Sequence, residues 1–350
     1  MDGRSIQGAQ SPGCDHETVN ELLSNFEGKQ ILVTGGAGCI GSNLVSVLLD
    51  SDAQQIVVLD DLSSSYEWNI PASPNVRFVK GSIIDDESLK TAFSEPPSFV
   101  FHLAAHFANQ NSIDHPEIDL LVNGQGTLKA LEYSRKANVS RFIFASSGCS
   151  VYGSKAPLPL TEDYVSLHLD TPYQITKLLG ELYCNFYRDY YNLPIVTCRF
   201  FNVYGPGEVP GKYRNVIPNF IYWALQNRAL PITGTGDETR DWTYVSDIVD
   251  GILRCATSPK AVGEAINLAS GIETRVSEVA RMVNLVTGNT SGMTKLPKRD
   301  WDKIDRRRAS IDKASRLIGY RPKVKLQDGI EKTMKWITAQ RIRIDQAARF

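Results

Sequence analysis

The sequence lacks closely spaced cysteines. It has six in all, and no two of them form a Cys-x-x-Cys pair: Cys14, Cys39, Cys149, Cys184, Cys198 and Cys255. Structural metal sites and disulfide frameworks need tighter spacing, and disulfides also need an oxidising compartment. We therefore predict reduced thiols, no metal site and a cytoplasmic protein.

Long hydrophobic runs and a charge excess are also missing. No apolar stretch approaches the roughly 20 residues that cross a bilayer, and residues 1–29 contain no apolar core of a secretory signal. A net charge of −1 over 350 residues offers no broad attraction to nucleic acid or to an anionic membrane. We expect neither as a partner, so any bound anion must be met by locally placed groups.

What the sequence does contain is an alternation of two kinds of segment. Short β-branched or aromatic runs predict strands at 30–34, 55–60, 76–80, 98–102, 141–145 and 194–199. Stretches with helical character lie between them, the longest at 117–137 and 173–191. This alternation predicts an α/β fold with a parallel sheet covered on both faces.

The pattern changes along the chain. Residues 1–15 are rich in Gly, Ser, Gln and Pro, and a short helix is expected over 16–27. Beyond residue 203 the loops lengthen around predicted helices at 215–227 and 275–287. We predict a flexible tail at 1–28, a sheet domain at 29–202 to which later segments return, and a smaller C-terminal α/β cap at 203–340.

A glycine cluster follows the first predicted strand. It fits Gly-x-Gly-x-x-Gly through Gly36, Gly38 and Gly41, and the offset Gly-x-x-Gly-x-x-Gly through Gly35, Gly38 and Gly41. Glycines there let the backbone approach a pyrophosphate, which accepts hydrogen bonds from the first N–H groups of the next helix. The cluster predicts a doubly wound, Rossmann-type sheet that binds a dinucleotide.

An acidic residue completes this fingerprint. Asp60, with Asp61 beside it, ends the second predicted strand about 20 residues after the cluster. A carboxylate there accepts hydrogen bonds from the ribose of NAD and repels the 2′-phosphate of NADP, and no arginine immediately follows. We therefore predict NAD. Ser82 and Ile83, after the third strand, are either the adenine edge of the site or a simple surface turn.

Tyr173 and Lys177 form the candidate catalytic pair. Four residues apart on a predicted helix, they share one face. The ammonium and a nicotinamide cation should stabilise a phenolate and lower the Tyr173 pKa from about 10. The tyrosine then serves as a general base on a substrate hydroxyl. A Tyr and a Lys at this spacing are common on solvated helix faces, so the catalytic interpretation depends on the other motifs.

Those motifs occur together and in order. They are the glycine cluster, Asp60, Ser146-Ser147, Val151-Tyr152-Gly153, Tyr173 with Lys177, the run Arg199-Phe-Phe-Asn-Val-Tyr-Gly-Pro206, and Arg240-Asp241. With them, residues 29–338 resemble the extended short-chain dehydrogenase/reductase family of nucleotide-sugar enzymes, and are most similar to its UDP-glucose 4-epimerase branch. The resemblance implies bound NAD, a nucleotide-sugar substrate, which we expect to be a UDP-sugar, and a homodimer paired through the helices at 117–137 and 173–191.

The resemblance also implies roles for single residues. Tyr173 becomes the base, and Lys177 its partner and ribose anchor. The implied cofactor site comprises Gly35, Gly38, Cys39, Ile40, Gly41, Asp60, Asp61, Ser82, Ile83, Leu103, Ala104, Ala105, Asn123, Tyr173 and Lys177. The implied substrate site comprises Asn109, Ser147, Asn202, Val216, Arg240, Arg299 and Asp302. Asn123 could instead be a hydrogen bonder inside a helix, and Arg299 a surface charge.

One loop departs from the family's spacing. The family places a Ser or Thr three positions before Val-Tyr-Gly, and that count falls on Gly148, which has no hydroxyl. A one-residue loop insertion makes Ser147 the catalytic serine, with Ser150 as the alternative. Cys149 is expected to be a small packing residue rather than a nucleophile.

The same loop bears on the reaction. Family members that dehydrate or decarboxylate the sugar carry an acidic residue just before Val-Tyr-Gly, because elimination needs a proton donor. Here Cys149 and Ser150 stand there. We therefore predict an epimerase that removes hydride at C4, lets the 4-keto sugar turn and returns the hydride.

Several alternatives stay open. They are a 4,6-dehydratase, a UDP-glucuronate decarboxylase or epimerase, and a non-catalytic NAD-binding scaffold. The nucleotide, the sugar and the inverted carbon are also open. The basic run Arg306-Arg307-Arg308 is typical of a solvated or ion-paired face, with contact to a uronic acid carboxylate as the alternative.

Overall fold

The computed structural model describes residues 19–350. Residues 1–18 of the flexible tail predicted at 1–28, among them the first residues of the helix predicted at 16–27, lie outside this range. The rest of that segment is not a flexible tail, because Leu22 and Phe26 are fully buried in the core. Within it, helix α1 spans Val19–Ser24. The five cysteines in the described range are all free thiols.

Seven strands form the central sheet. They are β1 (Gln30–Thr34), β2 (Gln55–Asp60), β3 (Val76–Lys80), β4 (Phe99–His102), β5 (Arg141–Ser147), β6 (Ile195–Phe200) and β10 (Ala265–Leu268). All pairs are parallel, in the order β10-β6-β5-β4-β1-β2-β3. This confirms the doubly wound Rossmann-type sheet. The seventh strand comes from the C-terminal half of the chain.

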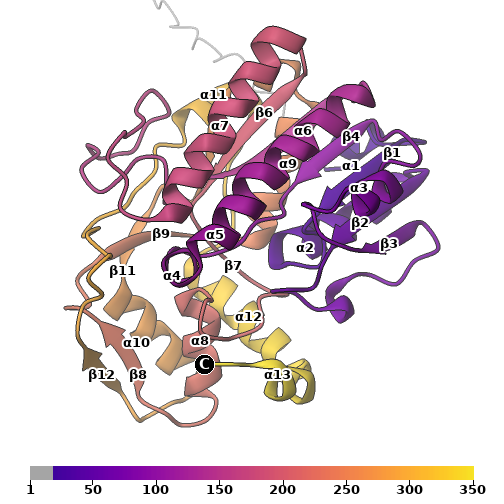
Figure 1. Cartoon of the computed structure of the whole chain (residues 1–350). Helices are drawn as coiled ribbons and strands as arrows, with labels where there is room; N and C mark the ends of the chain where they lie inside the picture. Colours follow the sequence, from indigo (N-terminus) through magenta and orange to yellow (C-terminus); the bar gives the residue numbers. More distant parts are fainter. Residues whose placement is uncertain (1–18) are drawn as a thin grey trace, which may run out of the picture.

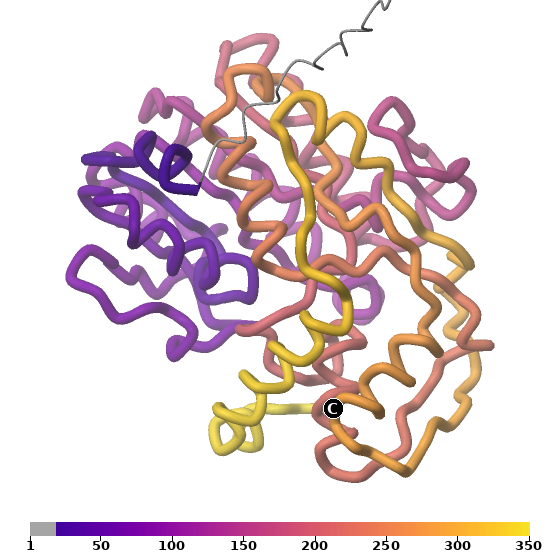
Figure 2. Tube along the Cα trace, turned by 180° about the vertical axis from the view of Figure 1, so that it is seen from behind, coloured from indigo at the N-terminus to yellow at the C-terminus, as the bar shows by residue number. Residues whose placement is uncertain are grey.

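Helices cover both faces of the sheet, because each central strand is apolar on both sides. On β1, Ile31 and Val33 join a core with α1, α2 (Cys39–Leu48) and α9 (Val245–Thr257). Leu32 joins the opposite core with α3 (Asp86–Ala92), α6 (Thr127–Lys136) and α7 (Pro172–Tyr191). Figure 1 shows α6 and α7 side by side on one face. Figure 2, seen from behind, shows α9 beside the indigo helices α1 and α2.

The helix predicted over 117–137 is interrupted. It consists of α5 (Pro116–Asp119), a π-helical segment at Leu120–Gly126 and α6. A π segment adds a residue per turn and is common at functional sites. The helix predicted at 173–191 is continuous. Pro172 opens it, the Thr171 hydroxyl accepts a hydrogen bond from the Gln174 amide, and Asn192 ends it in a left-handed conformation.

The C-terminal half adds helices and two small sheets. The sheets are β11 (Glu273–Arg275)-β9 (Thr239–Tyr244)-β7 (Asn202–Tyr204), and β12 (Met293–Leu296) beside β8 (Leu230–Thr233). The helices are α4 (Asn109–Asp114), which lies earlier in the chain but borders this half, and α8 (Val216–Ala224), α10 (Val276–Thr287), α11 (Asp312–Ile318), α12 (Leu326–Ala339) and α13 (Arg341–Ala347). The helices predicted at 215–227 and 275–287 are α8 and α10.

One apolar core joins the two halves. It runs from β1 and α2 through α9 into α8, α10 and α12 without a break. The two halves therefore share one continuous core, and the boundary at 202/203 stays a prediction. Among the described residues, no helix combines the length and apolar character needed to cross a bilayer.

Candidate active site

A cavity of about 1060 Å³ opens between the carboxyl ends of the sheet strands and the C-terminal half. It lies where the strand order reverses beside β1 and β4, the usual place for a ligand in a doubly wound sheet. Every residue predicted for catalysis, cofactor or substrate lines it except Asn123. The structure therefore brings together side chains that are far apart in the sequence.

The glycine cluster forms the floor at the start of α2. Gly35 has a positive φ of 71°, and a Cβ there would lie 2.7 Å from the Ala104 amide nitrogen. A Cβ on Gly41 would lie 2.3 Å from the Gly35 carbonyl oxygen. Only hydrogen atoms fit at these positions, so backbone N–H groups can approach a ligand closely. This cradle fits the pyrophosphate of a dinucleotide.

Asp60 is fixed at the end of β2. Its carboxylate accepts hydrogen bonds from the Ala37 amide at 3.0 Å, the Leu62 amide at 2.9 Å and the Ser65 hydroxyl at 2.6 Å. Asp61 is exposed and accepts from the Ser63 amide. Of the two acids, Asp60 is therefore the one hydrogen-bonded to the glycine cluster. At that position its carboxylate can accept a hydrogen bond from a ribose hydroxyl. Further along the same wall lie Ser82 and Ile83, at the position expected of an adenine edge.

The candidate catalytic residues are buried at the cavity wall. The Lys177 ammonium donates to the Ala145 carbonyl oxygen at 2.9 Å and lies 5.7 Å from the centroid of the Tyr173 ring. Tyr173 shares a hydrogen bond with Ser147, the last residue of β5. The phenol, the ammonium and this hydroxyl therefore form one cluster facing the cavity.

The two alternatives to Ser147 do not reach the cavity. A Cβ on Gly148 would lie 2.2 Å from the Phe201 ring. Ser150 is fully buried, its hydroxyl has no partner, and it does not line the cavity. Cys149 does line it and lies 3.4 Å from the Asn202 side-chain oxygen. The geometry thus favours the one-residue insertion.

The expected direction of the Tyr173 pKa is wrong for the chain's own groups. Burial raises this pKa above its ordinary value, and Asp119 and Cys149 raise it further, whereas the hydrogen bond with Ser147 lowers it. Burial also lowers the Lys177 pKa to about 8. The sequence argument counted the ammonium but could not count the loss of water around the phenol.

Asn123 stands behind the wall instead of on it. Its side-chain oxygen accepts from the His106 amide at 2.8 Å, and its amide donates to Asp119 at 2.6 Å. Thr176 of α7 donates to the same Asp119 carboxylate at 3.0 Å. Asn123 therefore supports the wall and, through Asp119, the helix α7. Its direct contact with a cofactor stays a prediction.

A second buried group holds α7 from the other side. Glu181, one turn after Lys177, binds the Arg199 guanidinium through both carboxylate oxygens at 2.9 and 2.8 Å. It also accepts from the Ser146 hydroxyl at 2.5 Å. Arg199 comes from β6 and Ser146 from β5, so this ion pair anchors the catalytic helix to the sheet.

The predicted substrate residues form the opposite wall. Arg240 of β9 makes an ion pair with Asp302, 3.1 Å from both carboxylate oxygens. Arg299 is exposed, as its surface-charge alternative expects, yet it lines the cavity with its guanidinium 5.8 Å from the centroid of the Trp301 ring.

The remaining predicted residues lie on neighbouring segments. Asn109 accepts a hydrogen bond from Thr171 at 2.7 Å, Asn202 begins β7, and Val216 begins α8. All three line the cavity.

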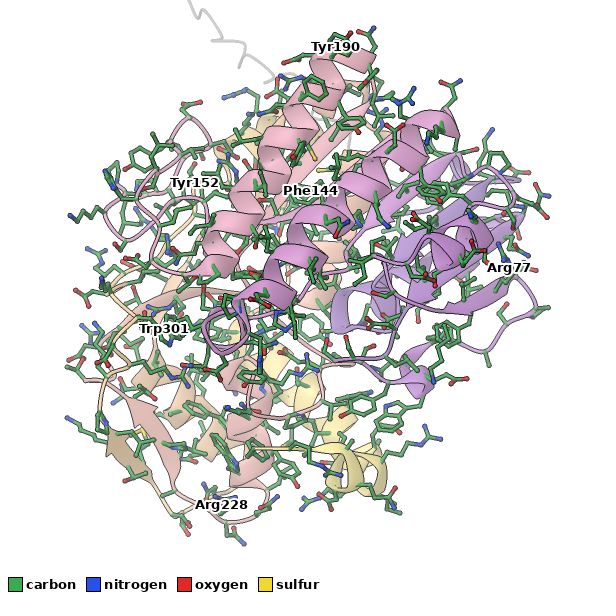
Figure 3. All side chains as sticks on the ribbon, in the orientation of Figure 1. Arg77, Phe144, Tyr152, Tyr190, Arg228 and Trp301 are labelled. Atoms are coloured by element: carbon green, nitrogen blue, oxygen red, sulfur yellow. The ribbon has the colours of Figure 1, made fainter. Side chains whose placement is uncertain are left out.

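Two further wall residues lie outside the predicted site: Trp301, which no sequence motif indicated, and Arg307, whose basic run had contact with a uronic acid carboxylate only as its alternative interpretation. Trp301, labelled in Figure 3 beside the C-terminal half, donates from its indole nitrogen to the Gln110 side chain at 2.7 Å and so joins the loop at 297–308 to helix α4. Arg307 lines the cavity and is only 2% exposed. Its burial follows from how the loop at 297–308 packs, which the basic run at 306–308 does not reveal.

Comparisons with known proteins agree with this geometry. The sequence model of the NAD dependent epimerase/dehydratase family matches residues 31–269. A UDP-glucose 4-epimerase of Mycolicibacterium smegmatis is 36% identical over 308 residues, covering 87% of this chain and 97% of that protein. A UDP-N-acetyl-alpha-D-glucosaminuronate decarboxylase of Bacillus cytotoxicus is 32% identical, covering 88% and 97%. The solved epimerase Mth375 of Methanothermobacter thermautotrophicus is 55% identical with a TM-score of 0.93, covering 95% and 98%.

Proposed function

Because the chain belongs to the NAD-dependent epimerase/dehydratase family, we propose that it inverts carbon 4 of a nucleotide-sugar, with a UDP-sugar as substrate. The observation that carries the proposal is the buried cluster of Tyr173, Ser147 and Lys177 at the cavity wall. The cavity of about 1060 Å³ also exceeds the usual size of a pocket for one small ligand, which is at most about 1,000 Å³. It therefore has space for both a cofactor and a substrate.

Bound NAD supplies reversible hydride acceptance at the reacting carbon. The chain's own groups handle the proton. Tyr173 accepts it from the C4 hydroxyl and gives it back after the sugar has turned, while Ser147 holds the same hydroxyl by a hydrogen bond. Since burial raises the Tyr173 pKa even with Lys177 nearby, the lowering needed for this task falls to the positive charge of the oxidised cofactor.

Inversion is favoured over elimination by what the serine loop lacks. Cys149 and Ser150 stand where a proton donor would be needed, and neither is an acid. The decarboxylase among the relatives is the reason to test this point directly. Inversion leaves the sugar with the same mass and oxidation state, whereas dehydration removes water and decarboxylation removes CO₂.

The test is a panel of nucleotide-sugars incubated with the NAD-loaded protein and followed by NMR and mass spectrometry. We expect a C4 epimer of unchanged mass. A product lighter by water or CO₂ would refute the epimerase. Absorbance near the reduced-nicotinamide band should change when substrate is added, and no change with any sugar would favour the non-catalytic scaffold.

We also propose a homodimer. An apolar stripe on α7 is exposed in the single chain: Ile175 (54%), Leu182 (56%), Phe186 (49%) and Tyr190 (70%), with Tyr190 at its far end in Figure 3. Such a stripe usually marks an interface. Sedimentation at micromolar concentration should give a dimer, and Leu182→Glu should give a monomer. The cytoplasmic location stays a prediction.

A further inference from the structure

The basic run at 306–308 divides on folding. Arg306 is exposed and paired with Glu273, in line with the solvated face expected from the sequence. Arg308 is half-buried and does not line the cavity. Arg307 is 2% exposed and forms part of the cavity wall. Arg307 therefore does not belong to the solvated or ion-paired face that such a basic run typically forms.

The Arg307 guanidinium has no anionic partner among residues 19–350. It donates to two backbone carbonyl oxygens, of Gly153 and Cys149, each at 3.1 Å. The two nearby carboxylates are engaged elsewhere. Asp302 binds Arg240, and Asp241 accepts from the Ser270 amide and hydroxyl and from the Gly271 and Ala309 amides.

Arg199 provides an internal contrast. Its side chain is 3% exposed, and Glu181 neutralises it through two hydrogen bonds. A buried cation without such a partner loses its hydration with no opposite charge to compensate for the loss. Arg307 loses its hydration at the wall of a cavity, where a ligand can supply the missing anion. A guanidinium has five donors in a planar fork that matches a carboxylate.

The position of Arg307 indicates which part of the ligand it meets. Both carbonyl acceptors belong to the loop that follows Ser147, the residue placed at the reacting hydroxyl. Arg307 therefore lies at the sugar end of the cavity, while Arg299 and Trp301 lie further along the loop at 297–308. We infer that the sugar of the natural substrate carries a carboxylate, as in a nucleotide-hexuronate, and that Arg307 recognises it. This inference rests on the proposed epimerase.

Binding separates a sugar carboxylate from the diphosphate as the source of the anion. Calorimetry on the NAD-loaded protein would use UDP, UDP-glucose and UDP-glucuronate. The wild type should bind UDP-glucuronate with an affinity at least about ten times that for UDP-glucose. Arg307→Gln should weaken UDP-glucuronate by about 10- to 100-fold, the value of a charged hydrogen-bonded contact. It should leave UDP and UDP-glucose within about threefold.

The matched control is Arg306→Gln, which removes an exposed neighbouring arginine and should change none of the three affinities. Equal weakening of UDP and both sugars by Arg307→Gln would assign the arginine to the diphosphate and overturn the inference. Equal wild-type affinity for the two sugars would overturn it as well. If Arg307→Gln does not fold, Arg307→Lys and the wild-type ranking still decide, since Lys keeps the charge but loses the planar fork.

Turnover of UDP-glucuronate separates this inference from the proposed function. A C4 epimer that keeps its carboxylate supports both. A product lighter by CO₂ refutes the epimerase and leaves carboxylate recognition intact. Inversion of UDP-glucose at least as efficient as that of UDP-glucuronate supports the epimerase and overturns the role of Arg307.

Discussion

The two walls of the cavity are built by different means. The cofactor wall presents mainly main chain: at Gly35 the glycine cluster and the segment 103–104 meet so closely that no side chain fits, and Gly41 lies equally close to the Gly35 carbonyl. The opposite wall presents long side chains from β9 and the irregular loop at 297–308, among them Arg240, Arg299 and Trp301. The first wall depends on backbone shape, and the second on the packing of individual side chains.

This difference governs how each wall responds to substitution. A backbone cradle is damaged by any added atom, whereas a side-chain wall is damaged by removal of a specific group. Tyr173 and Ser147 lie between the two walls and belong to the second kind. The following changes test the contrast.

Tyr173→Phe should have the largest effect. Removing the phenolic oxygen takes away the proton acceptor, so kcat should fall by about 10³-fold, while bound NAD and thermal stability stay near normal. Tyr190→Phe, at a tyrosine of the same helix that is 70% exposed, is the matched control and should keep full activity. Near-normal turnover of Tyr173→Phe would remove the tyrosine from the mechanism.

Gly41→Ala should act on the cofactor instead. Its Cβ would meet the Gly35 carbonyl oxygen at 2.3 Å, and backbone cannot move aside as a side chain can. Overpacking costs about 1–3 kcal/mol, so NAD affinity should fall by about 10- to 100-fold. Gly28→Ala is the control for NAD retention: its positive φ of 64° makes an alanine strained, but no atom lies within 4 Å of its Cβ and Gly28 does not line the cavity. Nicotinamide per subunit in the purified proteins measures both, and equal retention would contradict the backbone cradle.

Ser147→Ala should cost less, about tenfold in kcat, the value of one hydrogen bond to the reacting hydroxyl. Ser150→Ala should leave turnover almost unchanged, because that hydroxyl is buried without a partner outside the cavity. Steady-state rates of the two variants decide the loop alignment. The reverse order would restore Ser150 as the catalytic serine.

The smallest effect at neutral pH concerns His102, buried between Thr34 and Thr127 at 2.8 and 3.1 Å. Burial lowers its pKa from 6.5 to about 3. Between pH 6.5 and about pH 3, His102 binds a proton in the unfolded chain but not in the native protein. The free energy of unfolding therefore falls as the pH falls below 6.5. The loss is about 1.4 kcal/mol per pH unit.

Denaturant unfolding at several pH values measures this slope. His102→Gln should reduce it by about that amount between pH 6.5 and 4.5. His168→Gln, at an exposed histidine, should leave it unchanged. An unaltered slope in His102→Gln would mean that other groups set the acid sensitivity.

The same contrast explains what the sequence could reveal. A backbone site needs glycines, a strand and an acid in fixed order, and these are visible in the chain, so the sheet, the glycine cluster and Asp60 were predictable. Trp301 and Arg307 depend on how an irregular loop folds over the sheet, which no local pattern encodes. The helix at 117–137 was predictable from its pattern, but the π segment within it, which contains Asn123, was not. For the chain's own groups, the direction of the Tyr173 pKa was misjudged, because the sequence does not show how deeply the phenol is buried.

The catalytic helix is held in rotation on both sides of its reacting turn. Thr176 is tied to Asp119 on one side, and Glu181 to Arg199 on the other. A few degrees of roll about the axis of α7 would carry the phenol and the ammonium together out of line with the sugar. In the proposed reaction, accuracy then depends on Asp119, Glu181 and Arg199, none of which lines the cavity. Substitutions there should lower activity while leaving Tyr173 and Lys177 in place.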